Sequence, residues 1–338
     1  MDKFDKAMKR LLPTLRDVVG IDFGTSAVKA VRIRADGSGA MTVVAADVLP
    51  PLSMEVDDDA SAKPIAISKS LSAWTAALAF TSRKAVIKLV AEPKGTTYTP
   101  ASAPELLGLP KDHGLRIGFK RFESGDEKSV LILGVPDGEV ARLPKAMPAG
   151  KPMAGSAELA GLAALNCYDH AYGDEATEGC DLVMDFGAGV TTLGLFVHRQ
   201  PMVLRQFLEG YATVQKAVER DFQTDEATAR DIILSGQVDI SASLHTSLGG
   251  ILRQAGIAVD FMERRTGARL HRVFVSGGFA RNPGLRAEIK AALSFEPTVV
   301  DPWKKMTVRP NAVSKAALES GASFAAATAA AIECLEEK

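Results

Sequence analysis

Two aspartates, Asp22 and Asp185, each stand where an apolar stretch gives way to a turn, and both belong to the same Asp-Phe-Gly sequence, 163 residues apart. The turns consist of small residues, which let successive backbone N–H groups face a concavity that attracts anions. These residues are Gly24, Thr25 and Ser26 in the first turn, and Gly187, Ala188 and Gly189 in the second. A carboxylate beside a bound phosphate needs a hard cation between them, and Mg²⁺ with its retained waters fits that role. The repetition predicts a magnesium polyphosphate site in two halves, although either aspartate alone could simply accept hydrogen bonds from its own turn.

Lys29 lies on the strand that returns from the first turn. By the two-residue period of a strand it shares a face with Val31 and Ile33, while Arg32 and Arg34 take the other face. An ammonium on an apolar face needs an anion nearby. Phosphates held by the turn would supply one. A salt bridge to a core carboxylate, or a long stem that carries the charge to water, would also satisfy it.

A third motif, a pair of glycines, comes late in the chain. Residues 271–276 are typical of a buried strand, Gly277 and Gly278 form a turn, and Pro283 opens a helix. Adjacent glycines let the backbone approach a flat ligand closely. A tight turn with nothing bound has the same sequence, so this motif is informative only together with the other two.

Strands and helices must hold these motifs in position. Hydrophobic periodicity predicts strands over 41–49 and 85–90 and helices over 62–80, 156–168 and 314–335. Short strands over 115–122 and 130–135, among prolines and glycines, indicate a small inserted α/β subdomain. The predicted fold class is α/β, with two lobes built from a duplicated unit. The predicted division is 1–16 as a basic amphipathic segment, 17–95 as the first part of lobe I, 96–152 as the insertion, 153–180 as the connecting helix, 181–310 as lobe II and 311–338 as a helix on lobe I.

Taken in order, the three motifs resemble the two phosphate loops and the adenosine loop of the actin-like ATPases. Among these the chain is most similar to the PilM family of type IV pilus assembly. Lys29 stands seven positions after Asp22, where the related FtsA division proteins usually have no lysine. The resemblance spans nearly the whole chain and implies an actin-like (ribonuclease H-like) fold of two duplicated lobes with a small insertion.

By this resemblance, ATP and Mg²⁺ are the expected cofactors, with Asp22 and Asp185 holding Mg²⁺ through water. The expected nucleotide contacts come from both turns, the lysine and the adenosine loop: Gly24, Thr25, Ser26, Lys29, Gly187, Ala188, Gly189, Gly277, Gly278 and Phe279. Glu158, near the start of the helix over 156–168, is a candidate catalytic base, because related folds place a polar residue about there to orient the attacking water. An acidic residue in the first turn of a helix is also favoured by the helix dipole alone.

The adenosine half of the expected site departs from the family pattern. Relatives usually carry two glycines after the second hairpin, whereas this chain keeps only Gly210, followed by Tyr211. Relatives also carry an Ala-Glu-x-x-Lys pattern whose lysine position is occupied here by Asp231, although Arg230 could substitute from the adjacent position. We therefore expect ATP to bind weakly or structurally, with at most a slow ATPase activity.

The resemblance also implies a partner. In PilM relatives a groove beside the insertion receives the cytoplasmic tail of PilN, an inner-membrane protein. A PilN-like tail is therefore the expected partner, and the chain is expected in the cytoplasm at the inner face of the membrane, touching the membrane only through that partner. Self-association stays open. Two other functions are weighed beside this one: an FtsA-like filament protein of cell division, and a small-molecule kinase of the same superfamily, for which no catalytic carboxylate is evident.

The composition narrows the possible partners and cellular compartment of the protein. The 338 residues, 46% of them hydrophobic, suffice for two lobes, and a net charge of −1 argues against a nucleic-acid partner. The three cysteines lack paired metal spacing and suit a reducing compartment. No apolar run reaches membrane-spanning length, which predicts a soluble intracellular protein. The basic amphipathic segment over 1–16 suits either a membrane surface or partner, or a solvated tail.

Overall fold

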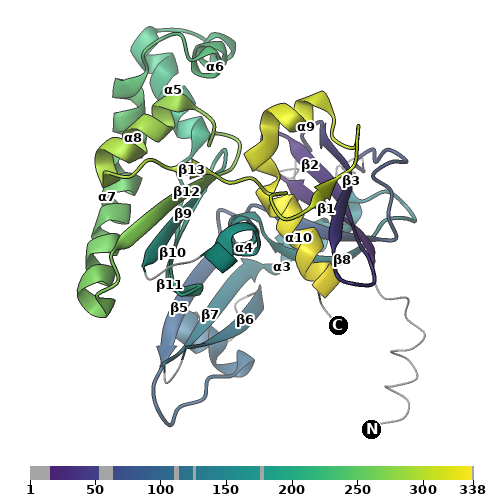
Figure 1. Ribbon diagram of the computed structural model, residues 1–338, viewed down its shortest axis with the longest axis horizontal. Coiled ribbons are helices and arrows are strands. Elements are labelled where there is room, and N and C mark those ends of the chain that lie inside the picture. Colours follow the sequence, from purple (N-terminus) through teal and green to yellow (C-terminus); the bar gives the residue numbers. More distant parts are fainter. Residues whose placement is uncertain (1–15, 53–63, 110–113, 125–126, 176–178, 337–338) are drawn as a thin grey trace.

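The computed structural model describes residues 16–52, 64–109, 114–124, 127–175 and 179–336. In this part of the chain the strands form two large sheets and one small sheet (Figure 1). All but the last residue of the predicted basic segment lies outside the described residues.

The first large sheet has the strand order β14-β3-β2-β1-β4-β8. Its strands are β1 (Asp17–Phe23), β2 (Val28–Ala35), β3 (Met41–Leu49), β4 (Thr75–Phe80), β8 (Met153–Leu159) and β14 (Thr307–Val308). The first three strands are antiparallel neighbours, and β4 and β8 continue parallel to β1. Along β1, Ile21 and Phe23 pack into one core while Val18 packs into another on the opposite face. Asp22 shares the face of Val18 by the two-residue period.

The second large sheet has the order β11-β10-β9-β12-β13. Its strands are β9 (Cys180–Phe186), β10 (Thr191–Val197), β11 (Gln200–Phe207), β12 (Leu270–Ser276) and β13 (Thr298–Val299), and four helices pack with it: α5 (Tyr211–Phe222), α6 (Glu226–Ser235), α7 (Ser241–Thr266) and α8 (Pro283–Leu293). In Figure 1, α7 and α8 cover one face of this sheet. Met184 and Phe186 of β9 pack on that side, whereas Val183 packs on the other. Asp185 shares the face of Val183.

The two large sheets repeat one design. From β3 to β8 and from β11 to β13 the order is the same, with an antiparallel three-stranded meander followed by two parallel strands. The turns repeat as well. A Cβ atom added to Gly24 would lie 2.8 Å from the carbonyl oxygen of Ala27, and one added to Gly187 would lie 2.8 Å from that of Val190. The predicted duplication is confirmed down to the close approach inside each turn.

The small sheet has the antiparallel order β5-β7-β6 and lies between β4 and β8 in the sequence. Its strands are β5 (Val86–Glu92), β6 (Leu115–Ser124) and β7 (Glu127–Pro136), and the short helices around it are η1 (Pro100–Ser102), α2 (Ala103–Leu107), α3 (Asp137–Arg142) and η2 (Pro144–Ala146). β5 also contacts β11, so the small sheet borders both large ones. This is the inserted α/β subdomain that the sequence predicts.

Two central helices connect the large sheets. α4 (Ala160–Tyr172) leads from β8 toward β9 and is followed by η3 (Gly173–Glu175), while α9 (Lys315–Ser320), η4 (Gly321–Phe324) and α10 (Ala325–Glu336) close the chain. Ala163 lies in a core shared with the alanines of α10, whereas Leu165 packs on the second sheet. The faces that carry the two aspartates therefore both turn toward α4, and that of the first sheet also packs against α10.

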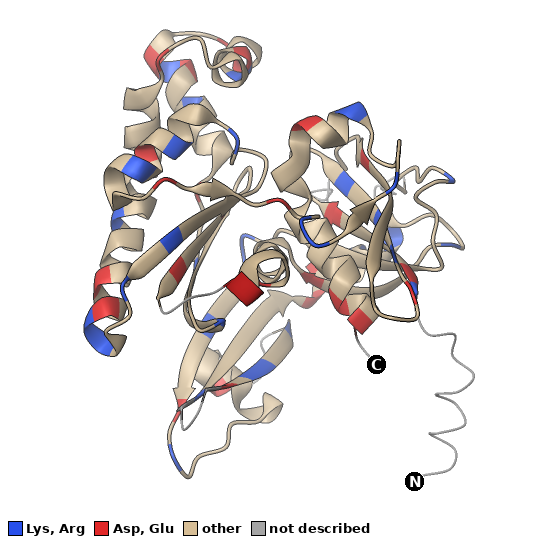
Figure 2. Ribbon diagram, viewed as in Figure 1, with Lys and Arg blue, Asp and Glu red and all other residues tan. Residues whose placement is uncertain are grey.

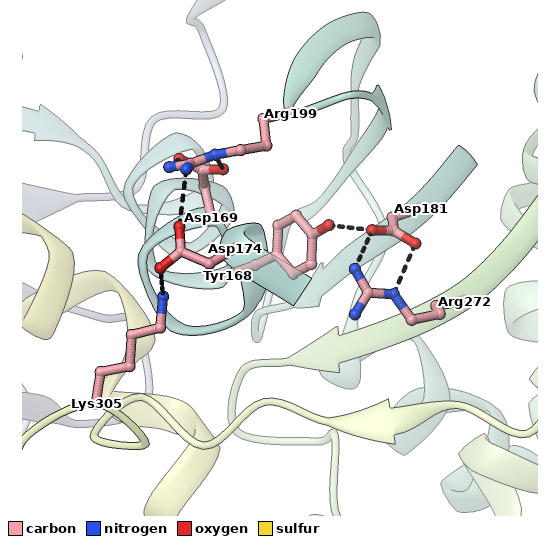
Figure 3. Close-up of polar contacts among 7 residues, drawn as sticks. All are labelled: Tyr168, Asp169, Asp174, Asp181, Arg199, Arg272 and Lys305. Carbon is pink, nitrogen blue, oxygen red and sulfur yellow. Dashed lines mark hydrogen bonds and ion pairs between the residues drawn. The ribbon is translucent and has the colours of Figure 1, made fainter. Parts of the chain in front are cut away.

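A polar cluster, buried at Tyr168 and Asp181 and exposed at Asp174, fastens the end of α4 to the second sheet and to the segment that returns to the first (Figure 3). Arg272 donates two hydrogen bonds, of 3.0 and 2.6 Å, to the carboxylate of Asp181, which also accepts one from the Tyr168 hydroxyl. Burial, together with this carboxylate, raises the pKa of Tyr168, so the phenol stays a donor. Beyond it, Lys305 of the returning segment contacts Asp174 at 2.6 Å. The contact thus joins the two segments that cross between the large sheets, the end of α4 with η3 and the returning segment around Lys305.

Several element predictions need correction. Residues 75–80, expected within a helix over 62–80, form strand β4, and residues 53–63 lie outside the described part. The strand expected over 85–90 exists as β5, but it pairs with β7 in the small sheet rather than in the first large one. The helix expected over 156–168 begins only at Ala160. The helix expected over 314–335 is interrupted around Gly321.

Candidate functional site

A cavity of about 580 Å³ lies where the two large sheets face each other, and both hairpins line it. The first hairpin contributes Asp22, Gly24, Thr25, Ser26 and Lys29. The second contributes Asp185, Gly187 and Ala188, and the late glycine turn adds Gly277, Gly278 and Phe279. The three motifs, far apart in sequence, therefore meet at one cavity.

The two glycines of the late turn, Gly277 and Gly278, lack a side chain for different structural reasons. Gly277 has a φ of +93°, and a Cβ atom there would lie 2.2 Å from the carbonyl oxygen of Phe186. At Gly278 an added Cβ would meet no atom within 4 Å. The first glycine is required for the turn to pass the end of β9, while the second leaves the cavity wall open.

Three predicted site residues are not among the described residues that line the cavity: Glu158, Gly189 and Gly210. The carbonyl oxygen of Gly189 accepts a hydrogen bond of 2.8 Å from Arg83. A Cβ atom on Gly210 would lie 2.4 Å from the carbonyl oxygen of Gly187, so this glycine lets the chain pass closely behind the second turn. Gly189 therefore belongs to the turn but is bound by Arg83, and Gly210 packs behind the turn from another part of the chain.

Glu158 lies on strand β8, where its register partner is Ala79 of β4. The helix-dipole argument for an acid at this position does not apply, because α4 starts two residues later. The first turn of α4 reaches the cavity with Ala160, Gly161 and Leu162, none of which has a side chain that can accept a proton.

Asp22 is buried, and its Oδ2 lies 3.5 Å from the ammonium of Lys29. Burial raises the pKa of Asp22, while the nearby Lys29 charge opposes that shift. Its other oxygen, Oδ1, is buried and has no hydrogen-bond partner among the described residues. A carboxylate oxygen left in this state is costly unless a cation or a donor reaches it. The arrangement fits Mg²⁺, a hard ion that prefers carboxylate oxygens and water.

Asp185 carries the opposing carboxylate. Its Oδ1 accepts a hydrogen bond of 2.8 Å from the hydroxyl of Ser276. Burial raises the pKa of Asp185 to about 7, the hydrogen bond from Ser276 lowers it, and the charge of Asp22 raises it further. A bound divalent cation would relieve the repulsion between the two carboxylates.

Sequence reasoning missed two cavity residues on the same sheet row as Asp185. Thr192 pairs with Asp185, and Gln206 pairs with Thr192. The repeat offset contained a signal for the first, because Thr192 stands 163 residues after Lys29 and is its counterpart in the second lobe. No motif marks Gln206, which lies on the next strand.

The residues at which this chain departs from the family pattern lie around Tyr211 and α6. Tyr211 and Phe279 both line it, with ring centroids 5.4 Å apart in an edge-to-face arrangement. Arg230 and Glu226, one turn apart on α6, also line it, whereas Asp231 is not among the described lining residues. The predicted substitution of Arg230 for the missing lysine therefore has the placement that it needs.

The repeated sheet order, with one hairpin turn from each repeat at a shared cavity, defines an actin-like fold. The solved structure of a PilM–PilN type IV pilus biogenesis complex is similar to the chain with a TM-score of 0.74 and 17% identity, covering 96% of this chain and 99% of that one. An archaeal actin homolog, Ta0583, gives a TM-score of 0.48 and 11% identity, covering 95% and 100%. A Bacteroides thetaiotaomicron protein with an actin-like ATPase fold gives 0.47 and 8%, covering 89% and 95%. No curated protein matches the sequence significantly.

Residues 157–334 match the family described as type IV pilus assembly protein PilM. The match covers more than half of the chain, so the chain belongs to the PilM family. Within the described residues, no helix is long and apolar enough to span a bilayer. In Figure 2 the positions of acidic and basic residues are interspersed along the ribbon of both lobes.

Proposed function

We propose that this chain is a cytoplasmic, actin-fold scaffold that binds ATP with Mg²⁺ weakly or structurally and recruits the cytoplasmic tail of a PilN-like inner-membrane protein during type IV pilus or secretion assembly. Family membership supports the setting in pilus assembly. The single observation that carries nucleotide binding is the meeting of both hairpins at one cavity. Asp22 and Asp185 would hold Mg²⁺ through water, and the backbone N–H groups of both turns, with Lys29, would hold the phosphates.

Calorimetric titration of ATP with Mg²⁺ into the full chain tests nucleotide binding. The proposal expects saturable one-site binding that is lost when Asp22 and Asp185 are both replaced by asparagine. A variant with Gly249→Ala is the control, because this glycine lies on α7 and a Cβ there meets no atom within 4 Å. Unchanged binding by the double variant would place the nucleotide elsewhere.

The partner proposal is supported by the similar fold of the PilM–PilN complex and by the small sheet inserted between β4 and β8. A fluorescent peptide with the sequence of the cytoplasmic tail of a PilN-like protein from the same organism should bind with a measurable change in anisotropy. Absence of binding by every such tail from that organism would remove this part of the proposal. Membrane contact is then expected only through the partner.

We expect little or no ATP hydrolysis. Where α4 begins, the cavity is lined by Ala160 and Gly161, so no side chain there can orient or deprotonate a water. Phosphate release above the background of the double aspartate variant would contradict this expectation. No feature of the described residues favours a division filament or a small-molecule kinase over the scaffold.

A further inference from the structure

Gln206 lines the cavity, but the proposed nucleotide site gives it no role. It is a lining residue at the end of β11, and its register partner on β10 is Thr192, which in turn pairs with Asp185. Directly opposed residues of antiparallel strands share a face, so Gln206 is on the face of Asp185. Two strand spacings separate their backbones by about 10 Å.

The orientation of the Gln206 amide is fixed by its neighbour. Its Nε2 donates a hydrogen bond of 2.8 Å to the carbonyl oxygen of Ser82, a buried residue that also lines the cavity. A backbone carbonyl can only accept, so the other amide atom, Oε1, must be the acceptor left over. This Oε1 is buried and has no hydrogen-bond partner among the described residues.

A buried acceptor without a donor costs free energy that a ligand can recover by supplying a hydrogen. The phosphate oxygens expected between the two turns are themselves acceptors, so they cannot satisfy Oε1. Water bound to a divalent cation is a strong donor, because the cation polarises its O–H bonds. A Mg²⁺ ion held by Asp22 and Asp185 through water would keep further waters, whose hydrogens could be donated to an acceptor on the cavity wall.

The repeat shows that only one lobe supplies such an acceptor at this place. In the first sheet the corresponding row runs from Asp22 to Lys29 and then to Val48. Val48 also lines the cavity, but its side chain cannot accept a hydrogen bond. The two sides of the cavity are therefore chemically different although their strand orders match.

We propose that Gln206 accepts a hydrogen bond from a water in the hydration shell of the divalent cation and so makes the cavity prefer magnesium-loaded ATP over the metal-free nucleotide. This inference rests on the proposed nucleotide binding. Gln206 acts as a binding residue, and its link to Ser82 holds it in place across the two lobes.

The test compares ATP affinity by calorimetry in Mg²⁺ and in EDTA. In Gln206→Leu, which keeps the size of the side chain but removes the acceptor, we expect the ratio of the two affinities to fall by about tenfold, the effect of one hydrogen bond to a charged group. The affinity measured in EDTA should change by no more than about twofold, because the lost contact needs the metal. Gln206→Glu, which like Gln206→Leu cannot donate to the Ser82 carbonyl, retains an acceptor, so it should keep most of the magnesium preference. A loss equal to that of the leucine variant would assign the effect to the Ser82 link instead.

Gln200→Leu is the matched control. Gln200 lies on the same strand, and its Oε1 is also buried with no partner in the described part of the chain, but it lines a different cavity beside the small sheet. Its affinity ratio should equal that of the unaltered chain. Thermal unfolding of all four proteins reports whether each variant is folded.

An unchanged ratio in Gln206→Leu, an equal loss in Mg²⁺ and EDTA, or the same loss in Gln200→Leu would overturn the role of Gln206. If the unaltered chain binds ATP equally well with and without Mg²⁺, the inference fails while nucleotide binding stands. If it binds no ATP under either condition, the proposed nucleotide function fails and this inference falls with it.

Discussion

The chemistry of this chain depends on a few ionisable side chains held in a buried place. Asp22, Lys29 and Asp185 have little exposure, and the lysine lies 3.5 Å from the first aspartate. The sequence left two anions open for Lys29, a phosphate or a carboxylate. The structure shows that the carboxylate of Asp22 is within ion-pair distance, and because an ammonium has three donors, Lys29 can contact a phosphate as well.

Replacing Lys29 by alanine should weaken ATP binding by about tenfold or more, because a buried charge-assisted contact to phosphate is lost. Calorimetry in Mg²⁺ measures this. Arg34→Ala is the control on the same strand. Arg34 does not line the cavity. It contacts Asp17, and in Arg34→Ala Asp17 still accepts its two hydrogen bonds from Arg32. Equal affinities for Lys29→Ala and the unaltered chain would remove Lys29 from the site.

Asp185 predicts a pH dependence of stability in the nucleotide-free protein. Its pKa is about 7 in the folded chain against an ordinary value of 3.8. Between these values the folded state binds a proton that the unfolded state has released, so this contribution to the free energy of unfolding is complete below 3.8 and is lost as pH rises toward 7. Asp185→Asn removes this dependence.

Urea unfolding at pH 5 and pH 8 measures this effect. The free energy of unfolding of the asparagine variant minus that of the unaltered chain should be larger at pH 8 than at pH 5. Parallel pH profiles for the two proteins would show that burial does not hold the proton on Asp185.

At the scale of elements, the repeated hairpins and the late strand-turn-helix could be predicted because their glycines and apolar runs are local signals. Residues 75–80 were predicted wrongly because an Ala- and Leu-rich run without polar alternation is typical of a helix, while a parallel strand buried on both faces has the same composition. Residues 153–159 contain few strand-forming side chains and are held extended by pairing with β4. Because of this second error Glu158 was predicted on a helix, whereas it lies on strand β8.

Close packing of the central helix on β1 depends on Gly20. A Cβ atom there would lie 1.8 Å from the backbone oxygen of Ala327 on α10, and neither backbone can easily move. Gly20→Ala should lower the free energy of unfolding by about 1–3 kcal/mol or more, measured by urea denaturation. Gly250→Ala, on α7 with no atom within 4 Å, is the control and should be neutral or stabilising by up to about 1 kcal/mol. Equal stability of the Gly20 variant would mean that α10 is not packed against β1 as described.

At the scale of the whole molecule, duplication explains why one cavity receives both aspartates. The first large sheet turns its aspartate face toward α4 and α10, and the second turns the equivalent face toward α4, so equivalent residues of the two repeats oppose each other. The sequence contained the repeat, but the row of Asp185, Thr192 and Gln206 arises from strand pairing between segments that no motif connects. Site residues within the motifs could therefore be predicted, and those brought in by pairing could not.

A ligand that bridges the lobes should stabilise the fold as a unit. At an ATP concentration of 100 times the dissociation constant, with Mg²⁺, binding to the folded state alone adds about 2.7 kcal/mol. Thermal unfolding should shift upward by several degrees in the unaltered chain and not in the chain with both aspartates replaced by asparagine. An equal shift in both proteins would indicate binding outside the cavity.

The central claim is that two equivalent acidic hairpins converge on one metal polyphosphate. A crystal structure of the chain with Mn²⁺ and a non-hydrolysable ATP analogue, with the metal located by its anomalous scattering, tests it most directly. We expect a single strong metal peak between the carboxylates of Asp22 and Asp185, with phosphate density against both turns. A metal and nucleotide bound elsewhere, with no such peak at these carboxylates, would contradict the account.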